Sequence, residues 1–121
     1  MISVEEIMGH PIPEGAQVYR SGDAVAVVLP LANPSQFEVH CAAAPCFRGK
    51  RSLDAFRALI SDFWLDHPEA HELIGVMPIE NRPARGNAAR LGFNRFLMGY
   101  LPWGNGEKRL AAAYRLKRVS Q

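Results

Sequence analysis

Cysteine is scarce in this chain, and its placement marks neither a metal site nor a disulfide framework. The 121 residues include two cysteines, Cys41 and Cys46, with no CxxC pair and no Cys/His spacing typical of zinc. The sequence has no secretory leader and no apolar run long enough to cross a membrane. We therefore expect a soluble, cytoplasmic protein with reduced thiols and no bound metal.

Low-complexity tracts, internal repeats and linker-like stretches are also missing, which predicts one domain over residues 1–121. The balance of 48% hydrophobic and 21% charged residues is that of an ordinary globular protein. The net charge of +2 is too small to indicate a nucleic-acid partner by itself, but it permits an anionic small molecule.

The first third of the chain has the alternation and the turn residues of β-strands. Residues 18–20 and 24–29 flank a Ser-Gly-Asp turn at 21–23, and Val25 and its neighbours favour an extended backbone. A second turn precedes the apolar segment 37–43. The pattern predicts three consecutive antiparallel strands.

The hydrophobic period becomes helical at Lys50. Apolar residues then recur on one face over residues 50–66, until Pro68 interrupts the pattern, which predicts an amphipathic helix of about four turns. Residues 73–77 form a short apolar run suited to a buried strand. A second helix is predicted over 81–91, capped by Asn81 and ended by Gly92.

Two more strands are predicted at the C-terminal end of the sequence. They cover residues 93–101 and 109–117, and the Trp-Gly-Asn-Gly sequence at 103–106 is a strong turn signal between them. The order βββ-α-β-α-ββ indicates a mixed α+β fold, with a mostly antiparallel sheet of about six strands and helices packed on it.

A short basic loop lies between the third strand and the long helix. Arg48, Lys50 and Arg51 stand where a helix begins, and a helix N-terminus offers unpaired N–H groups and a favourable dipole to an anion. These residues predict a phosphate site, although a solvated basic loop would have the same composition.

The segment 81–93 has a spacing that resembles the GNAT acyltransferase superfamily. It places Asn81, Ala84 and the pair Gly92-Phe93 in the register found after that family's fifth strand. The Arg-Gly-Lys loop at 48–50 stands where the family has its phosphate loop, and the order of elements agrees over about residues 16–118. The likeness is strongest to short, N-terminally abbreviated members found in phage genomes.

The resemblance implies a binding site for acetyl-coenzyme A as co-substrate and transfer of the acetyl group to an amine acceptor by direct attack on the thioester. It implies that the coenzyme lies between the strands over 37–43 and 73–77, with an oxyanion stabilised by a backbone N–H of the former. The residues expected to bind the coenzyme are Cys41, Ala43, Arg48, Gly49, Lys50, Arg51, Ser52, Leu53, Asn81 and Asn87.

An amine attacks only when it is neutral, so this activity calls for a general base near the sheet. His40 is the first candidate because it titrates in the useful range, and Glu80 and Glu38 are the others. Each of these residues could equally be an ordinary solvent-facing strand residue with no catalytic role. Many family members have a Tyr that protonates the thiolate at the position of Ala88.

Two other interpretations stay open at this point. The first is a catalytically inactive GNAT-fold binding or structural protein, favoured by Ala88 and by Arg51 and Leu53 in place of the family's small loop residues. The second is a nucleic-acid adaptor built on the arginines of 81–91, which is disfavoured because Arg90 is turned away from the others. A homodimer that completes the acceptor pocket is implied by the family alone.

Overall fold

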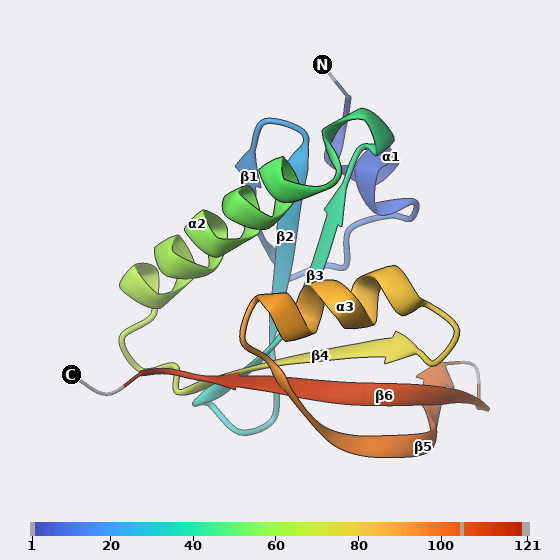
Figure 1. Cartoon of the computed structure of the whole chain (residues 1–121). Coiled ribbons are helices and arrows are strands. Elements are labelled where there is room, and N and C mark those ends of the chain that lie inside the picture. Colours follow the sequence, from blue (N-terminus) through green and yellow to red (C-terminus); the bar gives the residue numbers. More distant parts are fainter. Residues whose placement is uncertain (1, 105, 120–121) are drawn as a thin grey trace.

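The protein, described here by a computed structural model over residues 2–104 and 106–119, consists of one mixed sheet and three α-helices (Figure 1). The strands are β1 (Gln17–Ser21), β2 (Ala24–Pro30), β3 (Gln36–Ala43), β4 (Glu72–Pro78), β5 (Asn94–Gly104) and β6 (Glu107–Lys117). The helices are α1 (Val4–Met8), α2 (Lys50–Asp66) and α3 (Arg82–Arg90), with a 3-10 turn at Pro45–Phe47.

The six strands lie in the order β1-β2-β3-β4-β6-β5. Over the part of the chain that the structure describes, β3 and β4 are the only parallel neighbours, and all other pairs are antiparallel. This confirms the mixed α+β fold and the predicted order of elements from β1 onward. The predicted turn at 103–106 includes Asn105, which lies outside the described residues.

Helix α2 begins and ends where its hydrophobic period predicts. Its buried face includes Phe56, Leu59 and Phe63, and the helix packs across β1 and β2. Phe63 is 1% exposed and meets Phe37 of β3 edge to face, with ring centroids 5.1 Å apart. This contact fastens the helix to the middle of the sheet.

The C-terminal end of α2 is held by an arginine that lies more than 50 residues later in the sequence. Arg118, just after β6, donates hydrogen bonds to the carbonyl oxygens of Trp64, His67 and Ala70 at 2.9, 2.6 and 2.7 Å. Its guanidinium also lies over the Trp64 ring, 4.7 Å from the centroid. The carbonyls at the end of a helix lack intrahelical partners, so this side chain satisfies the Trp64 carbonyl, while the His67 carbonyl also accepts from the Ala70 N–H at 3.0 Å.

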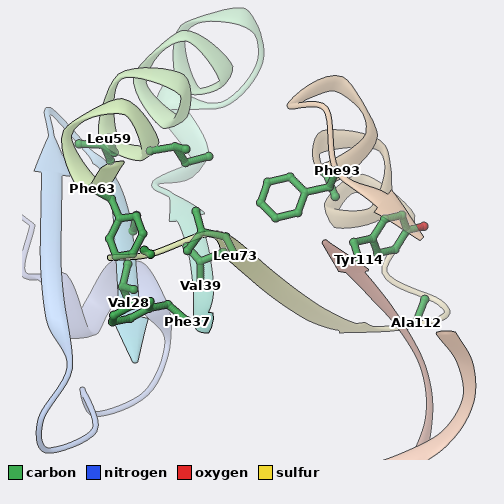
Figure 2. Packing of buried hydrophobic residues seen from close by; sticks show 13 residues of the cluster. Val28, Phe37, Val39, Leu59, Phe63, Leu73, Phe93, Ala112 and Tyr114 are labelled. Atoms are coloured by element: carbon green, nitrogen blue, oxygen red, sulfur yellow. The ribbon is translucent and has the colours of Figure 1, made fainter. Parts of the chain in front are cut away.

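Helix α3 covers the other half of the sheet. The side-chain oxygen of Asn81 accepts a hydrogen bond from the Ala84 N–H at 3.2 Å, as predicted for its cap, and Gly92 follows the helix with φ 95°. Phe93 and Tyr114 are buried beneath α3, and they belong to the same hydrophobic cluster as Phe63 beneath α2 (Figure 2).

The short helix α1 is an element that the sequence reasoning missed. The Ser3 Oγ accepts a hydrogen bond from the Glu6 N–H at 3.1 Å, and the S-x-x-E spacing of these residues is a helix-start signal. The helix contacts β2 and β3. Val25 and Val27 are buried although they alternate with the β2 residues that face α2, which places α1 on the opposite face of the sheet.

Candidate functional site

The sheet opens between its two parallel strands. β3 and β4 pair only over Gln36–Glu38 and Glu72–Ile74. Beyond this point β3 stays paired with β2 up to Ala43, while β4 follows β6 up to Pro78, so the two neighbours diverge (Figure 1). The facing edges therefore carry backbone N–H and C=O groups that no neighbouring strand satisfies, and such groups can pair with an extended ligand.

A cleft of about 1010 Å³ fills this opening and reaches both faces of the sheet. Val39 and Cys41 line it from the helix-covered face, whereas Glu38 and His40 line it from the other face, because successive strand residues point to opposite sides. Asn81 and Ala84, at the start of α3, border it as well. A molecule on one face can thus meet a molecule on the other through the gap.

The cleft contains an acid–base pair on the face away from α2 and α3. The His40 Nε2 donates to the Glu38 Oε1 at 2.8 Å, and these side chains are 37% and 29% exposed. The hydrogen bond from His40 holds the pKa of Glu38 below its ordinary value, against the opposing effect of burial. Glu38 is therefore an anion that fixes the orientation and tautomer of His40.

The third candidate base, Glu80, lies elsewhere. Its carboxylate accepts a hydrogen bond from Arg109 at 2.6 Å, its side chain is 65% exposed, and it is not among the cleft residues. Backbone hydrogen bonding and the Arg109 guanidinium lower the pKa of Glu80. The structure thus brings Glu38 and His40 together and leaves Glu80 in a surface ion pair.

An apolar wall faces the Glu38–His40 pair across the cleft. It is formed by β5 residues that the sequence reasoning did not select as site residues: Phe96, Leu97, Leu101, Pro102 and Trp103. Met8 and His10, at and after the end of α1, also line the cleft. No local signal identifies these residues, because their position depends on how the β5–β6 hairpin returns beside β4.

The N-terminus of α2 follows β3 after a short loop that contains the 3-10 turn at Pro45–Phe47, and it has no side-chain cap. Gly49 is the N-cap residue, with φ 96°, and no heavy atom lies within 4 Å of where a Cβ would stand. The Leu53 N–H donates to the Gly49 carbonyl at 3.1 Å, which removes it from the free donors. The amides of Lys50, Arg51 and Ser52 precede the first intrahelical bond and stay available to an anion.

The charged side chains of this loop are partly engaged. Arg48 donates to the Ala43 carbonyl at 3.2 Å, and Lys50, with a side chain 90% exposed, pairs with Asp54 at 2.9 Å. Arg51 donates to the Cys46 carbonyl at 2.6 Å and lies 4.5 Å from the Phe47 ring centroid. Three cations therefore gather at one helix start, with Arg51 turned toward the preceding loop.

A smaller pocket of about 90 Å³ lies between α2, α3 and the opening of the sheet. Asn87, Ala88 and Cys41 are among the residues that line it, and the other lining residues are mostly apolar. Solvent reaches Cys41 through the cleft, yet its apolar surroundings desolvate the thiolate and raise the pKa of Cys41 to about 12. This thiol is a wall residue and not a nucleophile at neutral pH.

The part of the chain over residues 2–104 and 106–119 contains no cluster of three or more His, Cys, Asp or Glu side chains arranged to hold a metal ion. None of its helices has the length and apolar character needed to span a membrane.

Comparison with known proteins identifies the fold. No protein-family model and no curated protein sequence matches the chain. The microcin self-immunity acetyltransferase MccE, in complex with acetyl-CoA and AMP, is similar at TM-score 0.67 and 15% identity, covering 87% of this chain and 62% of that one. A Bacillus subtilis acetyltransferase in complex with CoA is similar at TM-score 0.65 and 13% identity, covering 88% and 79%.

A GNAT-family acetyltransferase from Bacillus anthracis is also similar, at TM-score 0.60 and 17% identity over 78% of this chain. The chain spans only 57% of the length of that protein. At these identities the likeness shows a shared fold, which is that of the GNAT acetyltransferases.

Proposed function

We propose that this chain is an acyl-coenzyme A dependent N-acetyltransferase, in which an amine attacks the thioester of acetyl-coenzyme A directly. The observation that carries the proposal is the divergence of β3 and β4. It opens the sheet between the face on which the N-terminus of α2 lies and the face that carries the Glu38–His40 pair. A direct transfer needs this arrangement, because donor and acceptor must meet without sharing one pocket.

The residues present fit the coenzyme. Its pyrophosphate would be held by the free amides of Lys50, Arg51 and Ser52, with charge from Arg48. The open space beside Gly49 lets a ligand approach the backbone closely. The coenzyme's extended arm would pair with the unsatisfied edge of β3, near Cys41 and Ala43, and pass Asn81 and Asn87 at α3.

On the other face, His40 would accept the proton of the attacking amine. Its Nε2–H is bonded to Glu38, so the Nδ1 keeps the lone pair that a base needs. The amine nitrogen forms a bond to the carbonyl carbon, the carbon–sulfur bond breaks, and the amine proton moves to the Nδ1. The negative charge of Glu38 stabilises the imidazolium that results.

The leaving thiolate would depart without a side-chain proton donor at the position of Ala88. A thiol pKa of about 8.5 makes the thiolate a tolerable leaving group, so the lack of a donor slows the reaction and does not prevent it. A backbone N–H on the free edge of β3 would stabilise the oxyanion, and one such donor is worth about 3 kcal/mol.

Thermal unfolding with and without acetyl-coenzyme A tests the first step. Ligand at 100 times its dissociation constant adds about 2.7 kcal/mol, which raises the midpoint of a domain this size by several degrees. Arg48→Ala and Asn81→Ser should reduce the rise, each measured against its own ligand-free midpoint, and serine keeps a helix cap at position 81. Arg95→Ala, on β5, is the charge-matched control and should keep the full rise.

A rise in the midpoint would then be followed by thiol release in the presence of amines. If acetyl-coenzyme A leaves the midpoint unchanged, the enzyme proposal fails and the inactive GNAT-fold interpretation takes its place. The grouping with short phage-encoded members stays a prediction.

A further inference from the structure

The β5 wall of the cleft is built by two irregularities in the β5–β6 pairing. The register shifts once between Arg95 and Leu97 and again between Pro102 and Gly104. In a regular strand Phe96 and Leu97 would point to opposite faces, yet both line the cleft, as do the consecutive residues 101–103. The two shifts therefore turn additional apolar side chains into the cleft, as bulges beside binding sites do.

This wall leaves apolar surface in water. Phe96 is 41%, Leu97 48% and Trp103 37% exposed. Exposed apolar side chains that gather in one concave region indicate a site for an apolar ligand, because covering them is favourable. Ala113, on β6, also borders the cleft, and its small side chain leaves room for such a ligand.

The ionisable side chains around the cleft indicate which polar group the ligand carries in addition to its apolar part. Glu38 is the only carboxylate among the described cleft residues, and His10 and His40 are the only other ionisable side chains besides the inert Cys41. Two arginines near the wall lie over its aromatic rings. Arg115 lies 4.9 Å from the Phe96 centroid, and Arg109 lies 5.4 Å from that of Trp103 while it is paired with Glu80.

We propose that the acceptor is a primary amine carried on an aromatic or branched aliphatic body, without a carboxylate and without a second ammonium group. This inference rests on the proposed function. One carboxylate suits one ammonium group, which His40 then deprotonates, and the apolar wall takes the body of the ligand. A polyamine would leave a second charge against Phe96 and Leu97, and an amino acid would place its carboxylate beside Glu38.

The test is a comparison of three amines at saturating acetyl-coenzyme A. These are 2-phenylethylamine, phenylalanine, which adds a carboxylate, and putrescine, which replaces the ring by a second ammonium group. Release of the coenzyme thiol gives kcat/KM for each. We expect 2-phenylethylamine to exceed the other two by about tenfold or more, the size of a lost apolar contact or a buried unpaired charge.

Variants of the wall make the test specific to this surface. Phe96→Ala and Leu97→Ala should raise KM for 2-phenylethylamine severalfold and leave the midpoint rise with acetyl-coenzyme A intact. Tyr100→Ala is the matched control, because Tyr100 belongs to the same strand, is 72% exposed and does not line the cleft.

Each outcome separates the two proposals. Preference for putrescine or phenylalanine, with the coenzyme-dependent midpoint rise present, overturns the acceptor class and leaves the acetyltransferase standing. Absence of the midpoint rise overturns the acetyltransferase itself. If sedimentation shows a dimer that Leu97→Asp dissociates, and the wall variants do not change amine selectivity, the wall is a contact between copies and the acceptor inference is wrong.

Discussion

The half of the sheet beneath α2 and the half formed by β5 and β6 are built on different plans. In β2 the five residues from Ala24 to Val28 are each at most 2% exposed, and Phe63 of α2 is 1% exposed against them. In β5, by contrast, every described residue is exposed or half-buried. The first half holds its apolar side chains inside, whereas in the second half the apolar side chains of β5 stay at the surface.

Side-chain size differs in the same way. The α2 half is filled by rings, with Phe63 in edge-to-face or stacked contact with Phe37, Trp64 and His67. In the other half, the centre of β6 is the three alanines at 111–113, each at most 3% exposed. Figure 2 shows Ala112 and Tyr114 at the opposite end of the buried cluster from Phe63. Dense packing in the first half stabilises the fold, while small residues and exposed rings in the second leave room for a ligand.

Replacing His40 should produce the largest functional effect with little loss of stability. Because His40 is partly exposed and serves as the proposed base, His40→Ala should lower kcat for acetyl transfer by about 10² to 10⁴. The midpoint rise with acetyl-coenzyme A should be unchanged, since the residue faces the acceptor side. Glu38→Gln, which keeps shape but removes the charge, should have a smaller effect. Activity within about twofold of wild type in His40→Ala would assign the base elsewhere.

Phe63→Ala should, in contrast to His40→Ala, act mainly on stability. Removing a ring that is 1% exposed leaves a cavity beneath α2, and we expect the free energy of unfolding in urea to fall by about 3 to 5 kcal/mol. Leu65→Ala on the same helix is the control, because Leu65 is 79% exposed and its removal should change stability by less than about 0.5 kcal/mol. Similar losses of stability in both variants would contradict the conclusion that dense packing beneath α2 stabilises the fold.

Arg118 connects the two halves, and its replacement tests how far they depend on one another. Arg118→Ala removes three hydrogen bonds to the end of α2 and the loop that follows it, and we expect a loss of about 2 kcal/mol in the free energy of unfolding. Arg118→Lys should recover only part of it, because an ammonium group cannot reproduce the planar fork. A separate, earlier unfolding transition in Arg118→Ala would show that this side chain also couples the halves.

Local signals in the sequence predicted most of the helices and strands but not the apolar wall of the cleft. The change of period at Lys50, the cap at Asn81 and the turn at 21–23 each act within a few residues, and the structure confirms all three. The parallel pairing of β3 with β4 agrees with the helix that connects them, because parallel neighbours need such a crossover. Helix α1 was missed although Ser3 and Glu6 have the spacing of a helix start.

The candidate site was predicted only where one segment carries it. Arg48 and Gly49 do lie at a helix N-terminus, and Glu38 and His40 do share a face two residues apart. Whether Glu80 reaches the cleft depends on Arg109, which is 29 residues away and holds it at the surface. The apolar wall depends on two register shifts in β5, which arise from pairing with β6 and leave no local pattern.

The two cysteines offer the mildest test of the cleft's environment. Both are exposed, but desolvation raises the pKa of Cys41 to about 12, so its thiol stays protonated near neutrality. With iodoacetamide at pH 8, we expect Cys46 to be alkylated at least about tenfold faster than Cys41, followed by peptide mass spectrometry.

The same shift has a consequence for stability. The folded protein favours the neutral Cys41 thiol, so this contribution is complete below the ordinary thiol pKa of 9.0 and is lost as the pH rises toward 12. The raised pKa of Tyr19 acts over a similar range, so the comparison of wild type with Cys41→Ser isolates the thiol. The measurement is the free energy of unfolding as a function of pH between about 9 and 12. If this pH dependence is the same in wild type and Cys41→Ser, and the two cysteines are alkylated equally fast, water fills the helix-covered side of the cleft. That side would then be too polar for the apolar stretch of the coenzyme's arm.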